Sequence, residues 1–179
     1  MISVVIPAFN EEDSIENIIK ELLDVLKKMK LPSFEIILIN DGSTDNTLEI
    51  TKKLNIEVIS NPENIGYGFS LKRGIEKAKF ETVFIIDADQ TYPIEEFPKL
   101  YQEYLKGFDM VIGQRTGSFF IESSLKFFLR RILKFLVEFV ASKKIPDINS
   151  GMRIFNRDTI KVFFPHLSDS FSFTTSSTL

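Results

Sequence analysis

The 179-residue chain contains no cysteine, which excludes disulfide bonds, thiolate metal ligands and cysteine nucleophiles. It also lacks any run of about 18 uncharged apolar residues, so we expect no segment of it to span a bilayer. "MISVVIPAFNEE" has no basic start and soon reaches acidic residues, so no signal peptide is predicted. A net charge of −3 argues against a nucleic-acid partner bound through phosphate contacts. His166 is the single histidine, and we expect a surface or turn residue rather than a metal ligand.

What the chain does contain is a regular alternation of short β-branched runs and amphipathic segments. The apolar runs predict strands over residues 2–7, 34–40, 56–60, 83–87 and 110–113. Helical spacing of apolar residues predicts helices over 11–29, with Asn10 as N-cap, and over 47–54, 69–78 and 94–106. Such alternation indicates right-handed βαβ units, and therefore an α/β fold with a mostly parallel sheet in one domain, residues 1–179.

Two carboxylates stand at the end of one predicted strand, in the stretch "VFIIDADQTYP". Asp87 and Asp89 follow four apolar residues, and a pair of carboxylates resists burial unless a cation lies between them. Alternate residues of an extended segment point to the same side, so both can reach one hard cation. We favour a site for Mg²⁺ or Mn²⁺ with room for diphosphate oxygens. The alternative is a polar turn that closes a strand.

Polar residues follow the other predicted strands as well, and the carboxyl ends of parallel strands are where α/β sheets bind ligands. Asp41 begins an Asp-Gly turn and would also face this edge, where it could accept hydrogen bonds from a nucleobase or ribose. Gly66 and Gly68 do not form a dinucleotide fingerprint, because Leu71 replaces the third glycine, and no P-loop is present. The segments expected to converge are 7–11, 41–45, 87–89 and 113–115.

The chain resembles the family 2 glycosyltransferases with the GT-A fold in six collinear blocks: "VVIPAFNEE", "ILINDGSTDNT", "NIGYGFSLKRGIEKA", "FIIDADQTYP", "VIGQR" and "DINSGMRIF". The resemblance covers roughly residues 2–160, and its order and spacing are similar to the branch that makes polyprenyl-phosphate sugars. It implies a nucleotide-diphospho-sugar transferase fold, with a Rossmann-like, mostly parallel sheet and helices on both faces. Residues 1–114 would be the nucleotide-sugar-binding part and residues 115–179 the acceptor-side part.

The resemblance also implies roles for single residues. Asp87 and Asp89 would be the D-x-D pair that holds the metal and the donor diphosphate, and Thr91 stands at a third metal-contact position. Arg115 resembles an arginine that meets phosphate, and Arg153, with Ser150, belongs to an acceptor-side segment. The residues that would line the nucleotide pocket are Pro7, Ala8, Phe9 and Glu11, with Asp41 on the base or ribose.

The prediction of the acceptor depends on the absence of a carboxylate pair that could act as a general base. A sugar hydroxyl needs a general base, which the hydroxyl-using branch usually supplies as a Glu-Asp pair after the acceptor segment, and this chain has no such pair. A phosphate monoester is already ionised and needs cations, for which Arg115, Arg130, Arg131 and Arg153 are candidates. The predicted activity is inverting sugar transfer from a nucleotide-sugar to a polyprenyl phosphate. The alternatives are a glycan hydroxyl acceptor and a catalytically inactive nucleotide-binding module.

Residues 124–144, "SLKFFLRRILKFLVEFVASKK", combine one wide apolar face with a basic face. Such a helix can lie in a membrane interface, where anionic head groups attract it, or it can pack as an ordinary core helix. The expected location is the cytoplasm, with the cytoplasmic face of a membrane as the narrower alternative. A strand pattern is cut short in the final "SFSFTTSSTL", which favours a domain truncated at its C-terminus.

Overall fold

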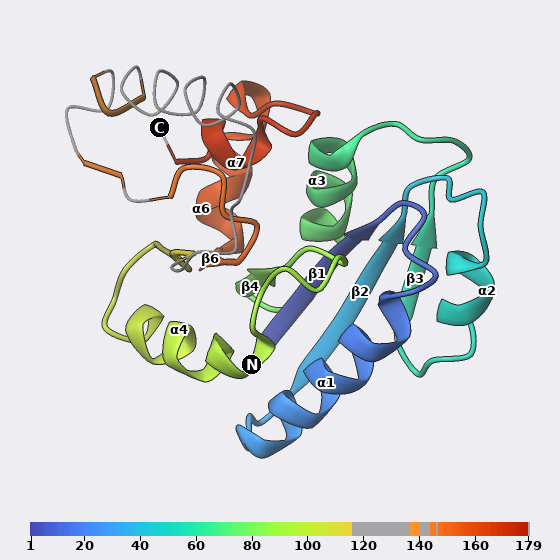
Figure 1. Ribbon diagram of the computed structural model, residues 1–179. Coiled ribbons are helices and arrows are strands. Elements are labelled where there is room, and N and C mark those ends of the chain that lie inside the picture. The colour runs from blue at the N-terminus through green and yellow to red at the C-terminus, as the bar shows by residue number, and fades with distance from the viewer. Residues whose placement is uncertain (116–136, 140–143, 146, 179) are drawn as a thin grey trace.

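The computed structural model describes residues 1–115, 137–139, 144–145 and 147–178. Its centre is a six-stranded sheet in the order β3-β2-β1-β4-β6-β5, covered by helices (Figure 1). The strands are β1 (Ile2–Ala8), β2 (Phe34–Asn40), β3 (Glu57–Ser60), β4 (Thr82–Ile85), β5 (Met110–Ile112) and β6 (Arg153–Asn156). The helices are α1 (Ile15–Lys28), α2 (Thr47–Thr51), α3 (Tyr67–Lys77), α4 (Phe97–Tyr104), α6 (Arg157–Val162) and α7 (Phe173–Ser176), with 3₁₀ turns η1 (Ile94–Glu96) and η2 (Phe164–His166).

The sheet is parallel through its first four strands, and Val5 of β1 lies between Ile37 of β2 and Ile85 of β4. The sixth strand, β6, was not expected from the sequence. It runs antiparallel to both of its neighbours, β4 and β5, and so β5 runs parallel to β4. The prediction of an α/β fold with a mostly parallel sheet is therefore confirmed, and the strands before the polar segments end at one common edge.

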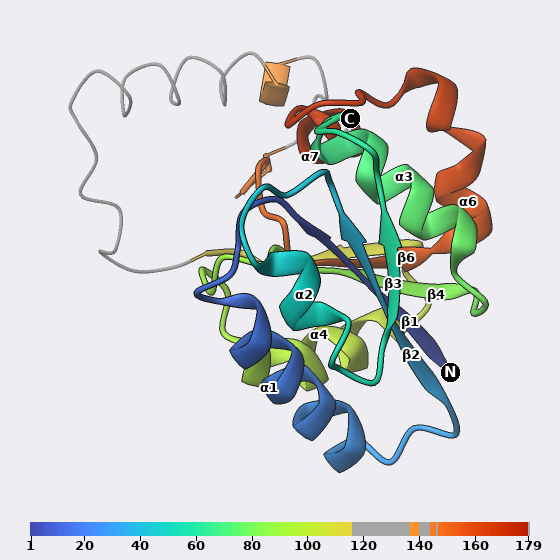
Figure 2. The same ribbon diagram turned by 90° about the vertical axis from the view of Figure 1, so that its right-hand side faces the viewer.

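Helices cover both faces of the sheet, as Figures 1 and 2 show from perpendicular directions. Side chains of alternate strand residues point to opposite faces, so Val4 and Ile6 pack with α1 and α4, whereas Val5 packs with α3, α6 and α7. All seven residues of β1 are buried, as expected for a central parallel strand. The apolar face of α1 that lies against the sheet consists of Ile15, Ile18, Ile19, Leu22 and Leu26.

Some element boundaries differ from the predictions. Asn10 is not the N-cap of the first helix, which is capped at Ser14; instead Asn10 has φ +57° and accepts a hydrogen bond from the Thr44 amide at 2.8 Å. The helix predicted over 47–54 ends at Thr51, and the one over 94–106 consists of η1 followed by α4. None of the helices among the described residues is long and apolar enough to span a bilayer. The segment 124–144 lies almost wholly outside the described residues, so its predicted membrane contact stays a prediction.

Candidate active site

A cavity of about 570 Å³ lies at the carboxyl ends of β1, β2 and β4, a volume within the usual range for small-molecule sites. Eight of the residues that the sequence predicted for the site line this cavity: Pro7, Ala8, Phe9, Glu11, Asp41, Asp87, Asp89 and Arg115. The lining residues that sequence reasoning did not single out for the site are Asn64, Tyr67, Ala88, Asn149, Phe171, Ser172, Thr174 and Thr175, together with Gly66. The four strand ends expected to converge do meet at this cavity.

Asp87 follows β4 and is partly buried, whereas Asp41 is 3% exposed. The Tyr67 hydroxyl donates a hydrogen bond to its Oδ1 at 2.7 Å. The pKa of Asp87 is raised to about 6, chiefly by burial and also by the charge of the nearby Asp89, while the Tyr67 hydroxyl acts in the opposite direction. Gly151 packs so closely against Asp87 that a methyl group at position 151 would overlap the carboxyl group.

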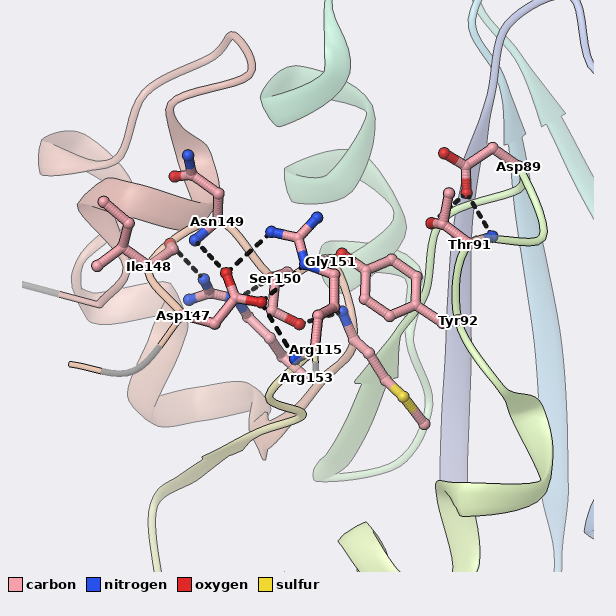
Figure 3. A network of polar contacts seen from close by, with 11 residues as sticks. Asp89, Thr91, Tyr92, Arg115, Asp147, Ile148, Asn149, Ser150, Gly151 and Arg153 are labelled. Atoms are coloured by element: carbon pink, nitrogen blue, oxygen red, sulfur yellow. Dashed lines mark hydrogen bonds and ion pairs between the residues drawn. The ribbon is translucent and has the colours of Figure 1, made fainter. Parts of the chain in front are cut away.

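Asp89 is exposed and lies two residues further along, in a tight turn. Its Oδ1 accepts hydrogen bonds from the Thr91 amide at 3.1 Å and the Thr91 hydroxyl at 2.6 Å (Figure 3). Gln90, between them, has φ +58°, and the Ser14 hydroxyl ties the turn to α1 through a 2.6 Å bond to the Ala88 carbonyl oxygen. The hydroxyl of Thr91 is thus directed to Oδ1 of Asp89.

The carboxylates of the cavity repel one another, which is the signature of a site suited to a cation. The pKa of Glu11 is raised by partial burial and by the charges of Asp89 and Asp45, although the Ser14 hydroxyl donates to it. Asp87 and Glu11 therefore both feel the charge of Asp89. Within the described residues no three acidic or histidine side chains converge as a complete metal site. A divalent cation held by Asp87 and Asp89 would need further oxygen ligands, and Mg²⁺ and Mn²⁺ commonly take these from phosphates and water.

Asp41 fastens the loop that closes one side of the cavity. Its Oδ1 accepts from Asn61 Nδ2 at 2.6 Å and from the Ile65 amide at 3.1 Å, and its Oδ2 accepts from the Gly66 amide at 3.0 Å. Next to it, Gly42 has φ +69° and lies against the backbone of Glu63, where a methyl group would collide. The carboxylate thus orders residues 61–66 while it lines the cavity.

Arg115 lines the cavity and is paired with Asp147, a residue that the sequence did not single out. Its guanidinium forms a two-point ion pair with Asp147, with Nε to Oδ2 at 2.7 Å and Nη2 to Oδ1 at 2.9 Å (Figure 3). Partial burial would raise the pKa of Asp147, but the hydrogen bonds and charge of Arg115 outweigh it, so the pKa is lowered. The Arg115 Cζ atom lies 5.7 Å from the centre of the Tyr92 ring, whose hydroxyl accepts from the Gly151 amide at 2.6 Å.

Arg153 does not line the cavity, so the prediction that it contacts phosphate is not supported by the geometry. Its side chain is 0% exposed and donates to the carbonyl oxygens of Ile148 and Ser150 and to the hydroxyls of Ser177 and Thr178. Burial lowers its pKa to about 10, which still leaves it charged at neutral pH. Ser150 is also fully buried. Both residues lie within residues 147–178 and hold this segment together from within, and Arg130 and Arg131 lie outside the described residues.

A second cavity, of about 1300 Å³, meets the first at Asp87 and Arg115, which line both. It lies on the side of the sheet covered by α1 and α4. Part of its wall is apolar, from Ile18, Ile86, Ile94, Leu100, Val111, Ile112 and Met152. Arg115 is therefore at the junction between two spaces, and the wall of the second also carries the carboxylates Glu21, Glu95, Glu96 and Glu103.

Residues 167–176 form a wall of the first cavity and pack on the start of α3. The Phe171 ring stacks on Tyr67, with ring centres 5.7 Å apart and 15° between the planes. Gly68 lies so close to the Ser168 carbonyl oxygen that a methyl group there would overlap it, and Lys72 donates to the Leu167 carbonyl oxygen at 2.6 Å. The glycines of "NIGYG" thus serve a turn and a close contact.

Residues 3–164 match the family described as Glycosyl transferase family 2. The chain belongs to this family. It is 28% identical over 181 residues to a dolichyl-phosphate beta-glucosyltransferase of Trichomonas vaginalis, covering 91% of this chain and 55% of the relative. It is 28% identical over 187 residues to an undecaprenyl-phosphate 4-deoxy-4-formamido-L-arabinose transferase of Pseudomonas fluorescens, covering 96% and 54%. The chain spans about half the length of the curated relatives it matches.

The fold is also found among solved structures. Glucosyl-3-phosphoglycerate synthase from Mycobacterium tuberculosis, in complex with Mn²⁺, uridine diphosphate and phosphoglyceric acid, superposes with a TM-score of 0.75 and 22% identity. The match covers 98% of this chain and 61% of that one. At this identity the likeness establishes the GT-A fold alone, and with it the fold predicted from the sequence.

Proposed function

We propose that this protein transfers a sugar, with inversion, from a nucleoside diphosphate donor to a polyprenyl phosphate, and that the transfer depends on Mg²⁺ or Mn²⁺. The observation that carries the proposal is that Asp87 and Asp89 line the same cavity as Asp41 and the segment after β1. A diphosphate is strongly anionic, and a cavity with four carboxylates would repel it unless a divalent cation bound between them. The relatives named for dolichyl and undecaprenyl phosphate support the choice of acceptor.

The donor half of the site is assigned to the first cavity. Pro7, Ala8, Phe9 and Glu11 would contact the nucleoside, and Asp41 would accept a hydrogen bond from the base or ribose while it fixes residues 61–66. Asp87 and Asp89 would hold the cation. When bound, the cation stabilises the negative charge that develops on the departing nucleoside diphosphate.

The acceptor phosphate is assigned to Arg115, because this guanidinium lies where the two cavities meet. Asp147 and the Tyr92 ring fix its orientation, which favours two-point binding of phosphate oxygens. An oxygen of the acceptor phosphate attacks the anomeric carbon as the bond to the donor diphosphate breaks. The attacking oxygen is already ionised, so the step needs no general base.

The test is transfer of label from a panel of radioactive nucleotide-sugars into the organic phase, with extracted polyprenyl phosphates and Mn²⁺ present. We expect transfer by the wild-type protein and none by Asp89→Ala, because one of the two cation ligands is gone. Asp24→Ala on the exposed side of α1 removes the same type of side chain far from the cavity and should keep full activity.

Other outcomes would redirect or refute the proposal. Label that enters only a glycan with free hydroxyls would replace the phosphate acceptor by a hydroxyl acceptor. Nucleotide binding with neither transfer nor donor hydrolysis would support an inactive binding module. Full activity of Asp89→Ala, or activity unaffected by a chelator, would contradict the metal site.

A further inference from the structure

Asp87 is held from two sides by groups that carry no charge. Among the described residues, the Tyr67 hydroxyl is the hydrogen-bond donor to this carboxylate, at 2.7 Å from Oδ1. On another side the backbone of Gly151 lies against the carboxyl group, in a space that no side chain could enter. Since Tyr67 begins α3 and Gly151 precedes β6, the orientation of Asp87 depends on two distant parts of the chain.

We propose that Tyr67 is a positioning residue that holds the Asp87 carboxylate in the orientation the cation requires, an inference that rests on the function proposed above. A hydroxyl donor stabilises an ionised carboxylate without cancelling its charge. A lysine or arginine in the same place would neutralise Asp87 and repel the cation. Partners that hydrogen-bond a ligating carboxylate orient it in this way in metal sites generally.

The position of Tyr67 is itself fixed by contacts with the C-terminal segment. Its ring stacks on Phe171, and the start of α3 is tied to the same C-terminal segment by the Phe69 amide, which donates to the Asp169 carbonyl oxygen at 2.9 Å. Phe171 and Asp169, in the serine- and phenylalanine-rich end of the chain, thus help to fix the position of Tyr67.

The experiment compares Tyr67→Phe, which removes the hydroxyl and keeps the ring that stacks on Phe171, with the wild-type protein. The dissociation constant for Mn²⁺ alone is measured by electron paramagnetic resonance of the free ion. We expect about a tenfold weaker affinity in Tyr67→Phe, the lower end of the usual effect of removing such a partner. Tyr101→Phe removes a hydroxyl from a partly buried tyrosine of α4, outside both cavities, and should leave the affinity unchanged.

Crystal structures of the metal-free wild type and Tyr67→Phe give a second readout that a purely structural role would not move. We expect the Asp87 carboxylate to leave its wild-type torsion angle in the variant, while the melting temperature reports whether the fold is intact. Wild-type Mn²⁺ affinity in Tyr67→Phe, or an unmoved carboxylate, overturns the inference. Failure of the wild type to bind Mn²⁺ overturns the metal-dependent function, and the carboxylate positions in the two crystals then decide the inference by themselves.

Discussion

At the scale of single residues, Asp87 shows a conflict between stability and the proposed chemistry. Its pKa is about 6 in the folded protein because burial disfavours the charge, whereas its ordinary value is 3.8. Above pH 6 the carboxylate is ionised in both states, and the folded state carries the cost of burying it. A buried charge of this kind is retained where a site needs it rather than where the fold does.

Asp87→Asn should therefore stabilise the metal-free protein at about pH 8, by an amount on the order of 2 kcal/mol. The folded pKa is raised, so the folded state binds more protons than the unfolded state between pH 4 and 6. The gain should consequently shrink as the pH falls from about 6 toward 4, where the native carboxyl group is neutral as well. Urea denaturation of both proteins across this range measures it.

Asp89→Asn is the matched control for that measurement. Asp89 is exposed to solvent. An amide oxygen can accept the two hydrogen bonds that Thr91 donates as well as a carboxylate oxygen does. The substitution should change the free energy of unfolding little at either pH. A gain as large as that of Asp87→Asn would show that general charge repulsion in the cavity, and not burial of Asp87, limits the stability.

Arg115 is the residue whose substitution should separate donor from acceptor. We expect Arg115→Ala to raise the KM for polyprenyl phosphate at least tenfold and the KM for the nucleotide-sugar much less, because a charge-assisted pair with phosphate is worth about 1.5 to 3 kcal/mol. Steady-state kinetics with each substrate varied in turn measures the two values. Lys20→Ala on α1 removes an exposed cation paired with Glu16 and should alter neither. A larger effect on the donor KM would move Arg115 to the donor side.

At the scale of elements, the contact between α3 and residues 167–170 should make a glycine-to-alanine substitution in α3 destabilising, the opposite of its usual effect in a helix. Glycine to alanine in a helix usually stabilises it by up to about 1 kcal/mol. At Gly68 the added methyl group would overlap the Ser168 carbonyl oxygen, and overpacking of this kind costs about 1 to 3 kcal/mol. Gly68→Ala should therefore lower the free energy of unfolding, as measured with urea. A net gain would mean that the C-terminal segment moves aside without loss.

The elements that the sequence predicted well are those whose signal is local. β1, β2 and the run before Asp87 are β-branched and buried, and parallel strands bring the residues that follow them to one edge, so most of the cavity lining followed from the pattern. β6 has four residues and begins with an arginine, and no periodicity reveals that it enters the sheet between β4 and β5. Tyr67, Asp147 and Phe171 likewise reach the site only through tertiary packing.

The role of Arg153 likewise could not be predicted from the sequence, because its partners come together only in the folded chain. The sequence makes Arg153 a candidate phosphate ligand because a phosphate acceptor needs cations and "NSGMR" resembles an acceptor-side segment of the family. Its four acceptors are two nearby carbonyl oxygens and two hydroxyls about 25 residues later, and only the folded chain brings them together. Ser177 and Thr178, near the end of the chain, thus serve as partners of this buried cation.

At the scale of the whole molecule, the first cavity joins parts of the chain that are far apart in sequence. Its walls come from the strand ends of residues 7–89, from Arg115 and Asn149, and from residues 171–175. A ligand that fills it therefore contacts both the parallel half of the sheet and the segment that follows β6. Binding should stabilise these parts together, because unfolding either of them would destroy the site.

The last prediction follows from this arrangement and from the charge of the cavity. In a panel of nucleoside diphosphates tested with Mn²⁺, each nucleotide is present at about 100 times its own dissociation constant. The nucleotide whose base fits should then raise the melting temperature by roughly 5 to 10 °C, since mass action contributes about 2.7 kcal/mol. With a chelator in place of Mn²⁺ the shift should vanish, because Glu11, Asp87 and Asp89 then face the diphosphate without a cation. Asp89→Ala should behave as the wild type does with chelator. An equal shift with and without Mn²⁺ would mean that protein cations hold the diphosphate, and the metal site would have to be abandoned.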